Sequence, residues 1–267
     1  MVSIIIPTYK PGEYLRHCLD SLCNQNIAAS AYEIIVVLNG PINGYKERID
    51  AYCRQHAKHQ IKIITTDVAG VSHARNLGMA QAQGDYLIFV DDDDRISHNY
   101  LGELMKLASS STIVCSNVRQ INEATSEEMD NYIARAYKQH PKEADASLFT
   151  CRSFLSSAWC KIIPRDVIGA VQFDTRFALG EDSLFMFTVS KRIHHIAFAP
   201  SSCTYIVIAR HNSASRSFIS TKTKLKNIAL LCAAYTNVWV KHPFSYSFPL
   251  YLSRILATLL KLFRRSY

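Results

Sequence analysis

The chain has 267 residues, of which 48% are hydrophobic and 19% are charged, so it is neither a disordered polymer nor a collagen-like repeat. Its length suffices for one large domain with a sizeable core. The formal net charge is +8 at pH 7, yet residues 183–267 hold 12 Lys and Arg and no Asp or Glu. Such a basic C-terminal part favours an anionic partner, which can be nucleic acid, a membrane surface or a phosphorylated substrate.

Features that report on the cellular compartment point to the cytoplasm. No run of about 18 consecutive apolar residues occurs, so we expect no transmembrane helix. An apolar strand follows Met1 directly, and we expect no signal peptide. The eight cysteines include no C-x-x-C pair and no zinc-site spacing, which is typical of free thiols in a reducing compartment.

Short apolar runs alternate with amphipathic stretches over the first 120 residues. Strands are predicted at residues 2–7, 33–38, 61–65, 85–90 and 112–116, and helices at residues 13–24, 45–58, 71–83 and 99–109. Strands separated by helices are typical of βαβ units, which build a mostly parallel sheet covered by helices on both faces. We therefore predict an α/β fold.

The pattern weakens after Asn117. A polar stretch at residues 122–150 is interpreted as an insertion, and a helix at 180–192 and short strands at 197–199 and 205–208 follow. Beyond Pro249, Arg254, Thr258, Lys261 and Arg265 share one side of a predicted helix. The apolar side of that helix carries Leu252, Ile255, Leu256, Leu259, Leu260 and Phe263. This spacing predicts a basic, amphipathic C-terminal helix.

Four aspartates, Asp91 to Asp94, directly follow the predicted strand at residues 85–90. Ligands of open α/β sheets bind outside the carboxyl ends of the strands. Adjacent carboxylates repel one another unless a cation neutralises them, and hard oxygen ligands favour Mg²⁺ or Mn²⁺. The alternative is a solvated acidic turn that precedes the next helix.

A second acidic pair, Glu181 and Asp182, opens the predicted helix at residues 180–192. Carboxylates at a helix N-terminus complement the helix dipole, which is a purely structural explanation. The functional alternative is a general base that removes a proton from a substrate hydroxyl.

Two further positions can meet an anionic ligand or a metal. Arg75 lies in the segment from Gly70 to Gly78, whose glycines suit a tight turn and a close approach of helix and sheet. This segment is neither a P-loop nor a G-x-G-x-x-G fingerprint. His211 follows the predicted strand at residues 205–208, where a neutral imidazole can complete an oxygen-rich metal site.

Taken together, these segments resemble the family 2 inverting glycosyltransferases, which have the GT-A fold. The matching stretches occur in the family's order: VSIIIPTY at 2–9, GVSHARNLG at 70–78, AQGDYLIFVDDDD at 82–94, AWCK at 158–161 with FD at 173–174, and GEDSLF at 180–185. The resemblance implies a Rossmann-like nucleotide-binding GT-A domain at residues 1–213. Residues 1–117 would form its nucleotide-sugar half, residues 118–213 its acceptor-binding and catalytic half, and residues 214–267 a basic helical extension.

The resemblance also implies roles for individual residues. Asp182 would be the catalytic base, assisted by Glu181, and Lys161 and Trp159 would lie near the acceptor. The residues expected to bind Mn²⁺ or Mg²⁺ are Asp93, Asp91 and His211. The residues expected at the donor nucleotide are Pro7, Tyr9, Asn39, Arg75, Asp91 and Asp92. Asn39 stands where the family usually has an acid, and its carbonyl can accept from a base N–H without charge.

We therefore expect a metal-dependent, inverting glycosyltransferase that uses a nucleotide-diphosphate sugar, with a UDP-sugar as the expected donor. By analogy with the family, the acceptor would be a glycan or a lipid-linked molecule in bacterial surface polysaccharide or lipopolysaccharide synthesis. A sugar nucleotidyltransferase is an alternative, although it normally has a glycine-rich, Arg-containing loop where this chain has PTYKPG at residues 7–12. A nucleic-acid-binding protein is another, but no helix-turn-helix, zinc-finger or RRM signature accompanies the basic part.

The basic C-terminal helix is expected to hold the protein on the cytoplasmic face of the cell membrane. Its apolar side would enter the lipid interface while Arg254, Lys261, Arg264 and Arg265 reach anionic headgroups. The aromatic residues Phe244, Tyr246, Phe248 and Tyr251 suit the interfacial zone. The alternative is a helix that packs on the catalytic domain or pairs two chains into a homodimer.

Overall fold

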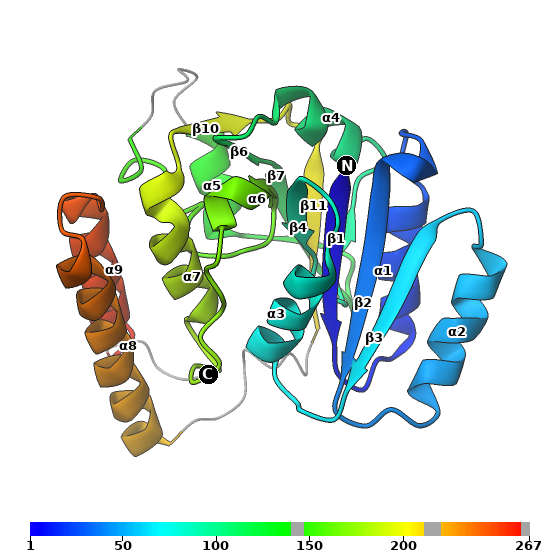
Figure 1. Ribbon diagram of the computed structural model, residues 1–267, viewed down its shortest axis with the longest axis horizontal. Helices are drawn as coiled ribbons and strands as arrows, with labels where there is room; N and C mark the ends of the chain where they lie inside the picture. The colour runs from blue at the N-terminus through cyan, green and yellow to red at the C-terminus, as the bar shows by residue number, and fades with distance from the viewer. Residues whose placement is uncertain (140–146, 211–219, 263–267) are drawn as a thin grey trace.

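The computed structural model describes residues 1–139, 147–210 and 220–262. Its centre is a seven-stranded, mostly parallel sheet with the strand order β10-β6-β9-β4-β1-β2-β3 (Figure 1). The parallel strands of the N-terminal half are β1 (Val2–Thr8), β2 (Tyr32–Asn39), β3 (Gln60–Thr66) and β4 (Tyr86–Phe89). The other half contains β6 (Thr112–Cys115), β9 (Lys161–Pro164) and β10 (His195–Phe198).

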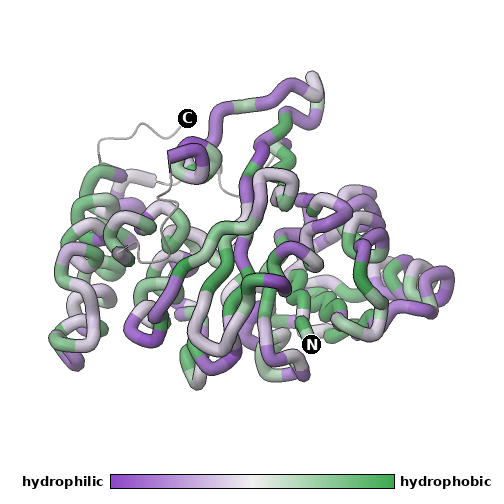
Figure 2. The backbone as a smooth tube through the Cα atoms, turned by 90° about the horizontal axis from the view of Figure 1, so that it is seen from above, coloured by the Kyte–Doolittle hydropathy of each residue, from purple (hydrophilic) through white to green (hydrophobic). Residues whose placement is uncertain are grey.

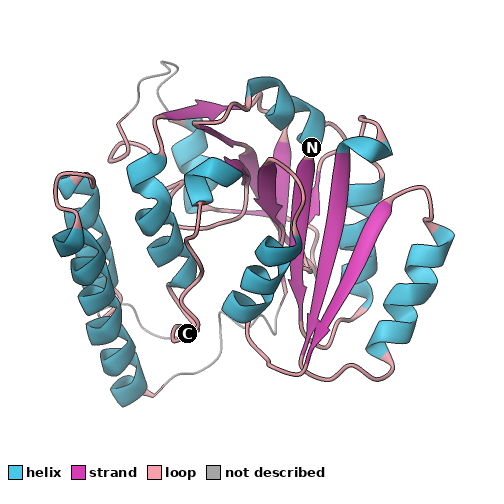
Figure 3. Cartoon of the chain, in the orientation of Figure 1, coloured by secondary structure: helices cyan, strands magenta, loops and turns pink. Residues whose placement is uncertain are grey.

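Helices cover both faces of this sheet (Figure 3). The helices of the first half are α1 (Glu13–Cys23), α2 (Tyr45–Gln55), α3 (Val71–Gln81) and α4 (Tyr100–Leu107). Strand β2 is buried along its whole length, because Ile35 and Val37 pack with Ala74 of α3 while Ile34 and Val36 belong to the larger core on the other face. The predicted α/β fold and its first five strands are thus confirmed.

Two glycines let α3 lie close to the sheet. Gly70 precedes the helix with φ +145°, a conformation that glycine adopts readily. Gly78 faces β1 so closely that a Cβ atom there would lie 2.4 Å from Cγ2 of Ile5. This confirms the predicted turn and close approach, and it brings the side chains of α3 to the carboxyl edge of the sheet.

A smaller sheet with the order β5-β11-β7-β8 lies beside the main one. Its strands are β5 (Arg95–Ile96), β7 (Asn117–Asn122), β8 (Glu128–Met129) and β11 (Thr204–Ala209). Strand β8 and helix α5 (Tyr132–Lys138) fall within the polar stretch predicted as an insertion. The sequence did not indicate β9, which pairs antiparallel with both β4 and β6 in the middle of the main sheet.

The second half adds α6 (Arg165–Ile168), α7 (Glu181–Val189) and a C-terminal hairpin of α8 (Thr221–Lys241) and α9 (Phe248–Leu260). The hairpin packs against α7 at one edge of the molecule (Figure 1). The alternative that the C-terminal helix packs on the rest of the protein is therefore confirmed for one side of the hairpin. No helix in the described part of the chain combines the length and apolar character that a membrane crossing needs.

The structure corrects one expectation about α9. Arg254 does not reach outward, because it is buried and its Nη2 donates to the backbone carbonyl of Arg152 at 2.6 Å. Tyr246 is also buried, with its hydroxyl donating to the carbonyl of Thr188 at 3.0 Å. Helical spacing correctly predicted which residues share a side of α9. The structure shows that the side with Arg254, and not the leucine side, faces the protein.

Candidate active site

The predicted site residues gather where β1, β2 and β4 end. Thr8 and Asn39 are the last residues of β1 and β2, and Asp91 to Asp94 follow β4. Arg75 lies on α3, which packs on one face of the sheet. Glu181 and Asp182 begin α7, in the second half of the chain. The carboxyl edge of a parallel sheet is where α/β proteins bind ligands.

Arg75 joins the two halves of the site. Its guanidinium is 3% exposed, with Nη2 2.9 Å from Oδ1 of Asp91 and Nη1 2.5 Å from Oδ1 of Asp182. Nη1 also lies 3.6 Å from Oε1 of Glu181. Burial disfavours the charged form, but the carboxylates of Asp182, Asp91 and Glu181 outweigh it and raise the pKa of Arg75 above its usual value.

The two acids at the start of α7 have different surroundings. Asp182 is held on both oxygens, because Oδ2 also accepts from the backbone N–H of Ala158 at 3.1 Å. The contact of Glu181 with Arg75 is longer, at 3.6 Å. Burial, together with the neighbouring charge of Asp182, raises the pKa of Glu181 to about 7. One carboxylate is thus fixed in place, while the other readily takes up a proton near neutral pH.

Each aspartate of the run after β4 has its own partner. Asp92 accepts from Oγ1 of Thr8 at 2.5 Å, and burial raises its pKa to about 7, with the charges of Asp93 and Asp91 adding to the effect. Asp93 accepts from both Nη2 and Nε of Arg210, at 2.5 and 3.0 Å. Asp94 is buried and accepts from the backbone N–H of Ile208 at 2.9 Å, so it anchors β11.

Three residues expected at the donor nucleotide have different environments. Tyr9 is about half exposed at the end of β1, whereas Pro7 lies inside the buried strand. Asn39 is 3% exposed, and its amide bonds the protein at both ends: Nδ2 donates to the carbonyl of Thr8, and Oδ1 accepts from the N–H of Gly70. The structure therefore gives Asn39 the role of tying together the loops that follow β1 and β3.

Lys161, which was expected near the acceptor, has a buried side chain, so it can act there only through the loop that it holds. Its side chain is fully buried at the start of β9, and Nζ donates to the carbonyls of Ser157 and Trp159 at 2.7 and 2.5 Å. These bonds shape the loop that presents the N–H of Ala158 to Asp182. Trp159 is partly exposed and stacks on Tyr205, with the ring centroids 5.0 Å apart.

Sequence reasoning missed Thr8 and Arg210. Arg210 lies 117 positions after Asp93, and its guanidinium also stacks 3.9 Å above the ring of Tyr14. The only signal was that Arg210, like the aspartates, follows a predicted strand. His211, which was expected to ligate the metal, lies outside the described residues.

The side chains suit a divalent cation that takes most of its ligands from a bound substrate. Among the described residues, no group of three His, Cys, Asp or Glu side chains is arranged to hold a metal by itself. Mg²⁺ and similar ions are often bound by one or two carboxylates plus substrate phosphates. Asp91 and Asp93 offer such oxygens at the sheet edge.

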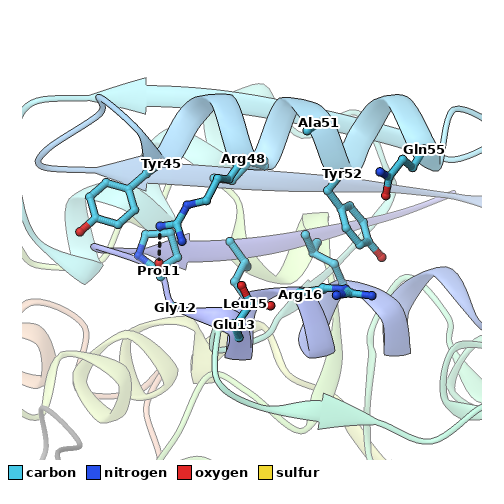
Figure 4. Close-up of a pocket in the computed structure, with 12 residues that line it drawn as sticks. Pro11, Gly12, Glu13, Leu15, Arg16, Tyr45, Arg48, Ala51, Tyr52 and Gln55 are labelled. Atoms are coloured by element: carbon cyan, nitrogen blue, oxygen red, sulfur yellow. Dashed lines mark hydrogen bonds between the residues drawn. The ribbon is translucent and has the colours of Figure 1, made fainter.

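A cavity of about 420 Å³ lies elsewhere, between α1 and α2 (Figure 4). Its walls include Glu13, Arg16, Arg48 and Tyr52, and Nη2 of Arg48 donates to the carbonyl of Pro11 at 3.1 Å. None of the carboxylates that follow β4 or open α7 lines it. We therefore assign the chemistry to the sheet edge and not to this cavity.

Comparison with protein families gives a match to the model described as Glycosyl transferase family 2, over residues 3–169. Among curated proteins, EpsH of Bacillus subtilis is 29% identical over 192 residues, which is 70% of this chain and 54% of EpsH. The poly(ribitol-phosphate) beta-N-acetylglucosaminyltransferase TarS of Staphylococcus aureus is 29% identical over 99 residues, 37% of this chain and 17% of TarS. The chain thus spans about half the length of EpsH, and the match to TarS covers a smaller part of that protein.

Solved structures share the fold. TarS residues 1–349 in complex with UDP-GlcNAc match with a TM-score of 0.71 and 20% identity, covering 88% of this chain and 66% of that one. The mannosyltransferase PcManGT from Pyrobaculum calidifontis, in complex with GDP-Man and Mn²⁺, matches with a TM-score of 0.65 and 15% identity, covering 98% of this chain and 69% of that one. At these identities the likeness establishes the architecture alone, and that architecture is the expected one.

The raised pKa values of Asp92 and Glu181 predict that the chain loses stability as the pH rises. Both acids keep their protons up to about pH 7 in the folded chain, whereas their ordinary pKa values are 3.8 and 4.5. The folded state then binds more protons between about pH 4 and pH 7, so the free energy of unfolding falls through this window. Urea unfolding without added metal, compared at pH 5 and pH 8, measures the fall.

The double variant Asp92→Asn/Glu181→Gln should weaken this dependence, because neither amide titrates, while the buried Asp94, whose pKa is raised by burial, still contributes to it. Glu47→Gln, which alters an exposed carboxylate of α2, is the matched control and should keep the wild-type dependence. A double variant that loses as much stability as the wild type between the two pH values would contradict the assignment.

Proposed function

The chain belongs to glycosyl transferase family 2, and we propose that it transfers a sugar from a nucleoside-diphosphate donor to an acceptor hydroxyl, with inversion of the anomeric carbon. The observation that carries this proposal is the placement of Arg75. It bridges Asp91, at the carboxyl edge of the sheet, to Asp182, at the start of α7. A donor at the first carboxylate and an acceptor at the second would meet beside one buried guanidinium.

Asp182 is the proposed general base. Arg75 and the N–H of Ala158 fix its two oxygens, and each oxygen retains a lone pair for the acceptor hydroxyl. As the acceptor oxygen bonds to the anomeric carbon, its proton passes to Asp182 and the bond to the nucleoside diphosphate breaks with its electron pair. Glu181 assists by keeping negative charge beside Arg75, or by taking up a proton near neutral pH.

Asp93 and Asp91 are the proposed protein ligands of Mn²⁺ or Mg²⁺. Support comes from the hard carboxylate oxygens at the sheet edge and from the Mn²⁺ in the PcManGT complex. When bound, such an ion would supply positive charge to the departing diphosphate. Arg210, which neutralises Asp93 in this structure, is placed to exchange partners between that carboxylate and a phosphate group.

A UDP-sugar is the proposed donor, since TarS binds UDP-GlcNAc in a related fold. The proposed acceptor is a glycan or lipid-linked molecule in bacterial surface polysaccharide synthesis, in keeping with the polymer named for TarS. Contact of Tyr9 and Asp92 with the nucleotide is part of the same proposal. We place the protein in the cytoplasm, peripheral to the inner face of the membrane where a lipid-linked acceptor is accessible.

Replacing the base is expected to slow the reaction without weakening donor binding. Asp182→Asn keeps the shape and the contact with Ala158 but cannot accept the proton, so kcat should fall about 10²–10⁴-fold. Release of UDP from a UDP-sugar in the presence of an acceptor extract measures the rate, and calorimetry measures donor affinity. Asp166→Asn, on the exposed side of α6, is the matched control. Wild-type turnover by Asp182→Asn would refute the assignment.

The metal proposal predicts that donor binding and metal binding support each other. A panel of nucleotide sugars is screened by thermal unfolding with and without Mn²⁺, and a true donor at about 100 times its Kd should raise Tm by about 5–10 °C. Mn²⁺ should enlarge this shift in the wild type. Asp93→Asn should lose the enlargement, because the phosphates then share the ion with one carboxylate fewer; each shift is measured from the variant's own Tm without ligands, since the change also removes the ion pair with Arg210.

Two outcomes would count against this account. If no nucleotide sugar raises Tm in the presence of Mn²⁺, the donor class is wrong. If Asp93→Asn responds to Mn²⁺ as the wild type does, Asp93 is not a metal ligand.

A further inference from the structure

Helix α9 of the C-terminal hairpin turns two polar residues, Arg254 and Thr258, towards the protein. On α9 the buried positions are Leu250, Arg254 and Thr258, which recur every four residues and face the protein. On α8 the buried positions are Ile228, Leu231 and Tyr235, and the hydroxyl of Tyr235 donates to Oγ of Ser183 in α7 at 2.7 Å. Packing against α7 therefore fixes which side of the hairpin points away from the protein.

The outward side of α9 is apolar. Phe248, Leu252, Leu256, Leu259 and Leu260 follow helical spacing on the opposite side of α9 from Arg254, and Leu256 is 59% exposed. Phe244, in the turn before α9, is fully exposed, and Val240 at the end of α8 is 59% exposed. We call these seven residues the hairpin face. Figure 2 shows hydrophobic segments along both helices, at the edge of the molecule.

The arrangement in α9 is the reverse of that in an ordinary surface helix, which turns its leucines to the core and its charges to water. Exposed apolar residues scattered singly need no explanation, but a row along one helix marks an interaction site. The hairpin face therefore needs an apolar partner.

The surrounding charge indicates which partner it is. Lys222, Lys226 and Lys241 are exposed on α8, and the chain has no Asp or Glu after Asp182. A second copy of the chain, paired through the same patch about a twofold axis, would bring lysines against lysines with no acid to compensate. A bilayer with anionic headgroups offers apolar depth for the leucines and negative charge for the lysines.

We propose that the hairpin face docks on the surface of an anionic lipid bilayer, with its leucines and phenylalanines in the interface and the lysines of α8 at the headgroups. In this proposal the lysines of α8 contact the headgroups, whereas the sequence pattern had predicted that contact for Arg254. Because α7 lies under the hairpin and begins with Glu181 and Asp182, docking holds the start of α7 near the bilayer. That this position serves a lipid-linked acceptor rests on the proposed function. Docking itself does not require catalysis.

The test is flotation of the full chain with vesicles. Vesicles of phosphatidylcholine mixed with phosphatidylglycerol should carry the wild-type chain to the top of a density gradient at low salt, and vesicles of phosphatidylcholine alone should carry much less. Leu256→Ser/Leu260→Ser should lower the partition coefficient about tenfold or more, since burying even one leucine is worth roughly that factor. The melting temperature of this variant should not fall, because both side chains point away from the core.

Leu107→Ser/Met129→Ser is the matched control, since these exposed apolar residues lie on α4 and β8. It should float as the wild type does. The proposal is overturned if the wild-type chain stays at the bottom with anionic vesicles, if neutral vesicles bind it equally well, or if the leucine variant floats unchanged. It is also overturned if the leucine variant instead turns a dimer into a monomer by light scattering, because a second copy then covers the face. None of these readouts depends on transferase activity.

Discussion

The buried guanidinium of Arg75 forms ion pairs with carboxylates from two parts of the chain that are distant in sequence. Burying a charge is costly unless partners surround it, and here Asp91 and Asp182 bond the guanidinium directly while Glu181 lies close by. Asp91 follows β4 and Asp182 opens α7, so the ion pairs fix the position of one half of the fold relative to the other. Nε of Arg75 has no hydrogen-bond partner in the structure, so the carboxylates on its Nη atoms carry the compensation.

The same edge of the sheet is rich in carboxyl groups. In the described part of the chain, Arg75 and Arg210 form ion pairs there with Asp91, Asp182 and Asp93, and Asp92, Asp94 and Glu181 lie nearby in sequence. Burial, with the neighbouring carboxylates adding to it, raises the pKa values of Asp92 and Glu181 to about 7. Under the proposed function, a divalent cation bound at Asp91 and Asp93 would add positive charge at this edge, where the diphosphate of the donor would leave.

Sequence reasoning recovered the parts of the fold that are governed by local patterns. Fully buried strands such as β1 and β2 are continuous apolar runs, and the acids after β4 follow from the rule for sheet edges. Strand β9 escaped detection because its four residues begin with Lys161 and end with Pro164, and because its antiparallel pairing is decided by distant segments. The contact of Arg210 with Asp93 is likewise non-local. For α9, periodicity defined two sides correctly, but only the packing on α7 shows that Arg254 is inside.

The central claim is that Arg75 and Asp182 form one energetic unit, and a double-mutant cycle tests it most directly. The free energy of unfolding by urea at pH 7 is measured for the wild type, Arg75→Gln, Asp182→Asn and the double variant. Each single change should destabilise the chain, whereas the double variant should lose less than the sum, giving a coupling energy of about 1.5–3 kcal/mol. Losses that add to within about 0.5 kcal/mol would show that the two side chains act independently, and would contradict the account.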